Sequence, residues 1–199
     1  MRYACATLAV LILTGCSDPP VVEKKEPAPP PMPVTGRQAF QTTYGIARNW
    51  APDAEPLRIR SLNLPNPKSE DGKAGAWEIV YVSESRGRSR TITWSAVESP
   101  GNLHKGVFAG IEEAWRPGGS ERPFPIAAVK FDTSDALKTA IAKSGDYMAN
   151  SKPKPEVSFL LQVTSHSQDP LWRVFWGNSV SSAEWSVFVD ATSGQYAGR

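Results

Sequence analysis

Residues able to support catalysis or metal binding are few in this sequence, and their spacing matches no common site. Its two histidines, His104 and His166, lie in segments rich in Gly, Asn and Ser that are typical of loops. Neither lies on a predicted helix with a second histidine, so we interpret both as surface residues and expect no metal. A Gly-x-Ser-x-Gly motif, the mark of one large class of hydrolases, does not occur. We expect no enzyme and no cofactor; a Ser/His/Asp triad assembled only by folding is the alternative.

Cys16 is the residue to which the sequence assigns a definite chemistry. It follows a mostly apolar run from Ala4 to Leu13, and Arg2 is the only charge before that run. The run has the length of a signal peptide and is too short to cross a hydrocarbon core of about 30 Å. Leu13-Thr14-Gly15-Cys16 resembles the bacterial lipobox, which implies cleavage before Cys16 and acyl chains such as palmitate on that residue. We predict a signal peptide over 1–15 and lipidation at Cys16; an ordinary secretory signal is the alternative.

The lipobox resemblance also implies a place in the cell envelope. The lipid on Cys16 would anchor the protein in a membrane, and Ser17 resembles the signal that sorts a Gram-negative lipoprotein to the outer membrane, facing the periplasm. Residues 16–35 are predicted to be a linker, because seven of the eighteen residues from Asp18 to Thr35 are proline. Such a segment favours extended polyproline II, which at ~3.1 Å per residue reaches about 55 Å. The linker therefore holds a folded domain away from the membrane.

Charge and cysteine content exclude other classes of protein. The net charge is +2, which becomes +1 when Arg2 leaves with the signal, so no nucleic-acid partner is expected. Cys5 leaves as well, so Cys16 remains as the single cysteine and no internal disulfide can form. An apolar content of 40% with seven tryptophans indicates a packed core from residue 36 onward.

The folded part shows internal similarity over a long period. Residues 76–81 match residues 171–176 in pattern, and residues 91–94 match residues 186–189, both at an offset of 95. At an offset of 97, Leu62 and Leu64 match Phe159 and Leu161, and Ala39-Phe40 matches Ala136-Leu137. Because these matches keep their order, we predict a duplicated unit: a first repeat over 36–97, a connecting segment over 98–130 and a second repeat over 131–199.

Each repeat is predicted to be a helix followed by three strands. Thr35-Gly36-Arg37-Gln38 has the form of a capping box, and Ala51-Pro52-Asp53 ends the helix that follows it. The second helix can be capped by Asp132 or Ser134, and its expected buried side comprises Leu137, Ile141, Ser144 and Met148. The strands should form an antiparallel meander with the helix on one face. The predicted fold class is α+β, with two αβββ repeats packed together, and residues 107–111 could add a strand.

Three segments of the second repeat resemble the PepSY-like domains of bacterial envelope proteins. Residues 131–140 resemble the start of their helix, residues 170–174 their central strand, and residues 189–194 their closing strand and turn. The first repeat departs from this pattern, because residues 91–95 lack the Asp-Ala-x-x-Gly ending. The resemblance implies a module without catalytic residues, of a kind associated with propeptides of secreted proteases and with envelope proteins, for which inhibition or protein binding is the usual proposal.

Two features outside the family pattern are candidates for binding. Arg86, Arg88 and Arg90 form a basic hairpin tip that could meet an acidic protein, lipid headgroups or lipopolysaccharide phosphates. The alternative is that these arginines keep a sheet edge soluble. Trp115 lies in a predicted loop and is the better candidate for an exposed anchor, whereas Trp77 and Trp172 recur in both repeats and are expected in the core. The adjacent pair Glu112-Glu113 is interpreted as solvated.

Together these observations predict a lipid-anchored extracytoplasmic module that binds or inhibits a protein partner in the envelope. A structural or assembly lipoprotein of the envelope is the first alternative, and an envelope hydrolase is the second. No motif in the sequence identifies the partner.

Overall fold

The structure is a computed structural model that describes residues 30–101, 103–150, 153, 156–165 and 167–199. The signal peptide, Cys16 and His166 lie outside these residues. Pro31 to Arg199 form one compact unit.

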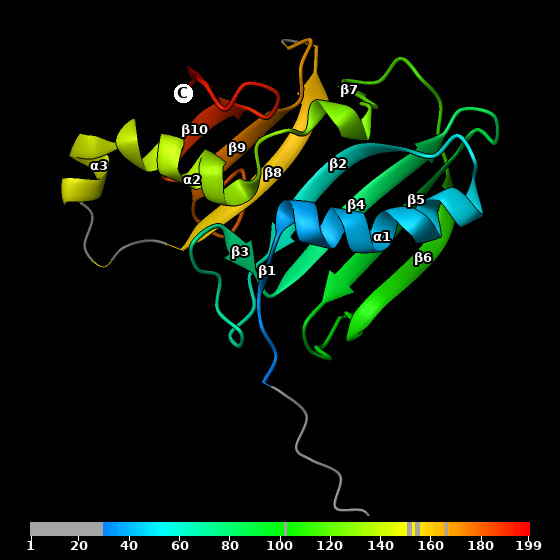
Figure 1. The fold of residues 1–199 in the computed structure, drawn as a ribbon, viewed down its shortest axis with the longest axis horizontal. Helices are drawn as coiled ribbons and strands as arrows, with labels where there is room; N and C mark the ends of the chain where they lie inside the picture. The colour runs from blue at the N-terminus through cyan, green and yellow to red at the C-terminus, as the bar shows by residue number, and fades with distance from the viewer. Residues whose placement is uncertain (1–29, 102, 151–152, 154–155, 166) are drawn as a thin grey trace, which may run out of the picture. The chain divides into compact units, whose positions relative to one another are not determined.

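This unit is built on one antiparallel sheet of nine strands, drawn in Figure 1. Its main path has the order β11-β10-β9-β8-β2-β4-β5-β6, and β7 pairs with β8 beside it. A two-stranded sheet of β1 and β3 lies apart from this path. The strands are β1 (Val34–Thr35), β2 (Glu55–Leu62), β3 (Lys73–Ala74), β4 (Ala76–Ser83), β5 (Arg88–Ser95), β6 (Gly106–Ala114), β7 (Glu121–Arg122), β8 (Val157–Thr164), β9 (Leu171–Trp176), β10 (Trp185–Asp190) and β11 (Tyr196–Gly198). The mixed α+β class is thus confirmed, and β6 contains the additional strand expected at 107–111.

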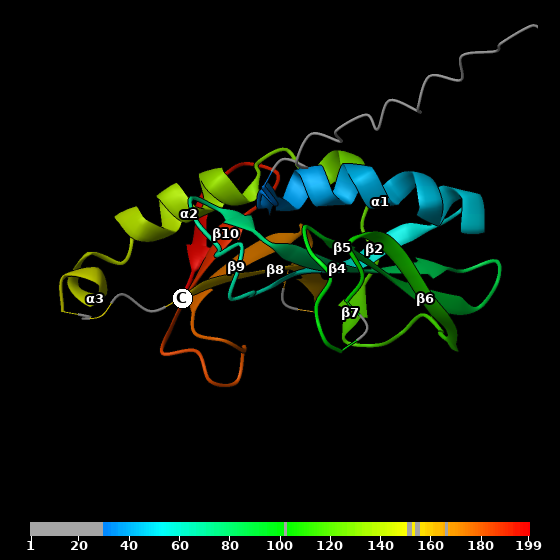
Figure 2. The same cartoon turned by 90° about the horizontal axis from the view of Figure 1, so that it is seen from below.

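Helices α1 (Gly36–Trp50) and α2 (Thr133–Ala142) lie on the same face of the sheet (Figure 2). The short helix α3 (Gly145–Asn150) follows α2, and a single 3-10 turn spans Ile126–Ala128. Alternate strand residues such as Trp77, Ile79 and Val174 are fully buried beneath the two helices. The opposite surface of the sheet, which neither α1 nor α2 covers, is called the open face below.

The sequence signals at the helix ends agree with the structure. Thr35 and Gln38 form the predicted capping box, because each side chain bonds the other residue's backbone N–H. Asp132 caps α2 by accepting from the Thr133 N–H. The expected buried side of α2 is wrong at Ile141, which is 45% exposed. The smaller Ala136 and Ala140 face the sheet instead, because the helix packs closely against β9 and β10.

The register of the sheet corrects one of the internal matches. Trp77 pairs with Trp94 as Trp172 pairs with Val189, so the two hairpins keep the offset of 95. In β2, however, Ile59 pairs with Ile79, and in β8 it is Phe159 that pairs with Val174. The positional counterpart of Phe159 is therefore Ile59. Matching Leu62 and Leu64 to Phe159 and Leu161 was wrong, because the loop from β2 to β4 is longer than the loop from β8 to β9.

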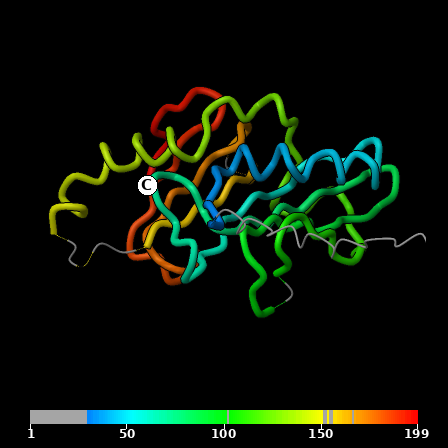
Figure 3. The backbone as a smooth tube through the Cα atoms, turned by 60° about the horizontal axis from the view of Figure 1, so that its bottom comes forward, coloured from blue at the N-terminus to red at the C-terminus, as the bar shows by residue number. Residues whose placement is uncertain are grey.

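The two helices begin next to each other and run apart, as Figures 1 and 3 show. The Gly36 N–H donates to Thr133 Oγ1 at 3.1 Å, and the Arg37 N–H donates to Asp132 Oδ1 at 3.0 Å. Beneath this junction, Trp77 Nε1 donates to the Val34 carbonyl and Trp172 Nε1 to the Phe131 carbonyl. Both tryptophans are fully buried, as predicted.

Candidate binding site

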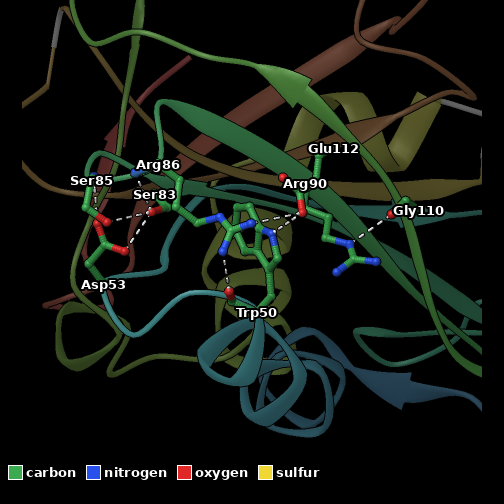
Figure 4. A network of polar contacts seen from close by, with 8 residues as sticks. All are labelled: Trp50, Asp53, Ser83, Ser85, Arg86, Arg90, Gly110 and Glu112. Atoms are coloured by element: carbon green, nitrogen blue, oxygen red, sulfur yellow. Dashed lines mark hydrogen bonds and ion pairs between the residues drawn. The ribbon is translucent and has the colours of Figure 1, made fainter.

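Two arginines of the predicted basic tip, Arg86 and Arg90, are bonded to residues of neighbouring elements, as Figure 4 shows. The Arg86 guanidinium donates through Nη1 to the Trp50 carbonyl and through Nη2 to Glu112 Oε1, each at 3.3 Å. It also lies over the Trp50 ring, 5.7 Å from the ring centroid. Arg90 Nε donates to the Gly110 carbonyl at 2.9 Å. Two of the three arginines predicted for binding therefore join α1, β5 and β6 to one another.

Glu112 is exposed to solvent, as the sequence interpretation expected, and it is also a partner of this cluster. Its Oε1 accepts from Trp50 Nε1 at 2.9 Å as well as from Arg86. The Trp50 hydrogen bond, assisted by the charge of Arg86, lowers the pKa of the Glu112 carboxyl below its usual range. The sequence could not show this contact, because it depends on β6 pairing with β5.

Arg88 differs from its two neighbours in the tip. It is exposed and opposes Ala114 across the β5–β6 pair, and no hydrogen bond or ion pair is found for its side chain among the described residues. Trp115 is close by, since its backbone N–H donates to the Gly87 carbonyl at 3.0 Å. Its side chain is half-buried rather than fully exposed. The structure thus brings Arg88 and Trp115 to the same end of the sheet.

Strand β6 forms one edge of the sheet, and within the described chain no strand pairs with its outer side. An extra residue between the pairs Arg90–Glu112 and Ile92–Ala109 makes a bulge in β6. Ile111 lies in this bulge and is 81% exposed, while Phe108 is 40% exposed. An unpaired edge that carries exposed apolar side chains is a template for pairing with another chain.

Asp53 joins the end of α1 to the β4–β5 turn behind the basic tip. Its Oδ1 accepts from the Ser83 hydroxyl at 2.6 Å, and its Oδ2 accepts from the Ser85 N–H at 2.9 Å. These two hydrogen bonds to the charged form lower the pKa of Asp53 to about 2. The carboxylate therefore has a structural role in shaping the turn.

His104 contacts a carboxylate and an aromatic ring. Its Nδ1 lies 2.7 Å from Glu98 Oε1, and its ring centroid lies 4.5 Å from that of Phe108. The backbone N–H of Lys105, together with His104, lowers the pKa of the Glu98 carboxyl. His166 lies outside the described residues. Within the described ranges, no group of three or more His, Cys, Asp or Glu residues could hold a metal ion, and no helix is long and apolar enough to cross a membrane.

The open face carries a cleft of about 1030 Å³ that sequence reasoning missed. It lies between the loop that follows β2 and the loop that follows β9, with Phe175 and Leu62 among its apolar lining residues. Arg60, Lys68 and Glu156 contribute charges, and Asn178, Ser179 and Ser181 contribute polar groups. No local signal could have revealed this cleft, because its walls come from strands that are neighbours only through the pairing of β2 with β8.

Comparison with known proteins gives a likeness of fold. No known protein family matches the sequence, and no curated protein matches it significantly. A crystal structure of a "putative lipoprotein" from Clostridium difficile 630 superposes with a TM-score of 0.53 at 10% sequence identity. The match covers 80% of this chain and 90% of that protein.

Proposed function

We propose that this protein is a lipid-anchored component of the bacterial cell envelope that binds a protein partner without catalysis, along the free edge of β6. In this proposal Cys16 carries the lipid, the proline-rich linker spaces the domain from the membrane, and in a Gram-negative cell the domain faces the periplasm from the outer membrane. The lipobox motif, the linker composition and the lipoprotein name of the structural neighbour support the anchoring part.

One observation carries the binding part of the proposal. Strand β6 is a free edge nine residues long. Its Ile111 side chain is 81% exposed, although an exposed position usually carries a polar residue. The exposed cation of Arg88 and the half-buried ring of Trp115 flank this edge at its end. Aromatic and arginine side chains beside an apolar contact are the residues that most often carry the energy of a protein interface.

Addition of a strand explains how such an edge can recognise a partner. An extended segment would bond its backbone to β6, while Ile111 and Phe108 would contact its side chains. A segment of the partner that is bound to β6 could not make its usual interactions at the same time, so binding could also inhibit the partner. The predicted PepSY-like character agrees with such a role and stays a prediction.

Site-specific cross-linking tests the binding surface. A photoreactive residue placed at Ile111 should cross-link a specific protein in intact envelopes, whereas the same residue at Ile46 should not. Ile46 is a matched control, because it is an exposed apolar residue on the helix side. Equal cross-linking from both positions, or from neither, would contradict binding along β6.

Metabolic labelling tests the anchor separately. Wild-type protein should incorporate labelled palmitate and be cleaved before Cys16, whereas Cys16→Ala should stay uncleaved and unlabelled. Cleavage of Cys16→Ala at its normal position would indicate an ordinary secretory signal instead.

A further inference from the structure

Arg173 lies in β9 on the open face, within the second half of the sheet, which consists of β8 to β11. Its neighbours Trp172 and Val174 point into the core, so Arg173 points the other way. The register places it in a cross-strand row with Arg60, Leu160 and Phe188. This surface is remote in strand order from the β6 edge, so the inference does not depend on the proposed function.

Arg173 lacks the carboxylate partner that the other open-face arginines have. Arg60 is 3.0 Å from a Glu78 carboxylate oxygen, and Arg58 is 3.0 Å from Glu121. In the part of the chain that the structure describes, the Arg173 guanidinium bonds only to the hydroxyl of Ser186, through Nε at 3.1 Å and Nη2 at 3.0 Å. The open face therefore holds one arginine whose charge is not compensated.

The surroundings of Arg173 hold its guanidinium in place and remove part of its hydration. The Phe188 and Phe175 ring centroids lie 5.5 Å and 5.9 Å from its guanidinium carbon. Leu160, its neighbour across the β8–β9 pair, is 6% exposed. Partial burial lowers the pKa of Arg173 from its usual value, in keeping with a charge that has lost solvent without gaining an anion. An arginine that contacts two aromatic rings and a hydroxyl is partly preorganised for a carboxylate, because less side-chain entropy remains to be lost.

We propose that Arg173 is a binding site for the side-chain carboxylate of an extended, acidic segment of a partner protein, which lies across the open face. The cleft beside it provides the room for such a segment. Phe175 belongs both to the surroundings of Arg173 and to the lining of the cleft. Asn178, Ser179 and Ser181 on its rim can exchange hydrogen bonds with a backbone.

The charge pattern favours a single carboxylate over a membrane surface. Attraction to anionic lipid headgroups relies on clusters of about four to eight Lys or Arg residues. On the open face, Arg58 and Arg60 are already neutralised by Glu121 and Glu78, and Arg173 and Lys68 are too few to make such a cluster. Arg173 also lies within the sheet among large apolar residues, where a narrow extended chain reaches more easily than a flat bilayer does.

Binding of a defined acidic peptide tests the proposal. The mature protein in detergent micelles is titrated into fluorescein-labelled hexaglutamate, and anisotropy is measured at low salt. Arg173→Met should weaken binding by about tenfold or more, and Arg173→Lys should weaken it less, because lysine keeps the charge but not the planar fork. Near-UV circular dichroism of each variant verifies that the core is intact.

Arg48→Met is the matched control. Arg48 is exposed on α1 and lies over the Tyr44 ring, so its replacement removes the same charge and a similar stacking contact from the helix side. It should bind hexaglutamate within about twofold of wild type, since net charge alone contributes little. Equal weakening by both variants, or absence of binding by wild-type protein, would overturn the proposal. So would Arg173-dependent binding to phosphatidylglycerol vesicles without binding to the peptide, because the ligand would then be a lipid phosphate.

Discussion

Trp77 and Trp172 converge on Gly36, the first residue of α1. A Cβ atom at Gly36 would lie 2.8 Å from Cη2 of Trp172 and 3.3 Å from Cη2 of Trp77, with Thr133 Cγ2 at 3.0 Å. Each tryptophan also bonds the carbonyl of the residue before a helix cap. The two halves of the sheet are therefore locked together where there is room for glycine and for no larger residue.

Gly36→Ala should destabilise the fold by about 1–3 kcal/mol, because the added methyl must displace buried indole rings. Denaturant unfolding measures this loss. Gly45→Ala is the control, since a Cβ atom there would have nothing within 4 Å beyond the adjacent residues and backbone of its own helix. It should be neutral or stabilise the helix by up to about 1 kcal/mol. A Gly36→Ala variant as stable as wild type would show that the rings can move apart.

Asp53→Asn should make the stability less sensitive to acid. The pKa of Asp53 is lowered to about 2 in the folded protein, so its carboxylate stabilises the fold above its unfolded pKa of about 4. That contribution is lost as the pH falls through 4 toward 2. Urea unfolding at several pH values should show a difference between wild type and Asp53→Asn that shrinks on acidification. A constant difference would assign the effect to something other than ionisation.

Tyr81→Phe should cost about 0.5–1.5 kcal/mol, the usual contribution of one buried hydrogen bond. The Tyr81 hydroxyl lies 2.8 Å from Thr43 Oγ1, which also reaches the Ala39 and Phe40 carbonyls. Burial raises the pKa of Tyr81 above its ordinary value of about 10. Tyr81 ionises more readily in the unfolded chain, so wild type should lose stability above about pH 10 more steeply than Tyr81→Phe does. Parallel pH profiles would contradict this.

Arg86→Ala and Arg88→Ala should separate stability from binding. Arg86 contacts Trp50 and Glu112, so its loss should lower the free energy of unfolding by about 0.5–1 kcal/mol. Arg88 has no such partner in the described ranges, so Arg88→Ala should change stability by less than about 0.5 kcal/mol. Arg88→Ala should instead reduce cross-linking from Ile111. If Arg88→Ala left cross-linking unchanged, Arg88 would have no part in the proposed interface.

Local patterns were sufficient to predict much of the fold. Three predicted features depend only on residues close in sequence, and the structure has all three. They are the capping box at Thr35, the alternation of buried residues around Trp172 and the turn at Asp190. The match of Leu62 to Phe159 failed because pairing with β4 sets the register of β2. Spacing along one strand does not contain that information.

The candidate sites were harder to predict, because they depend on contacts between distant segments. The sequence drew attention to Arg86 and Arg90, yet β6 brings Glu112 and the Gly110 carbonyl to them. Conversely, the residues next to Arg173 in the sequence do not reveal that its side chain has no carboxylate partner among the described residues of the folded protein. Its surroundings become defined only when β8, β9 and β10 align.

The junction of the two helices also has a mechanical consequence. In the proposed lipid-anchored protein, the linker leads into β1 and α1, so tension on the tether would reach this point before any other part of the domain. There the backbone of Gly36 and Arg37 is bonded to Thr133 and Asp132, which lie more than ninety residues further along the chain. Pulling force would thus be shared between both halves of the sheet at once.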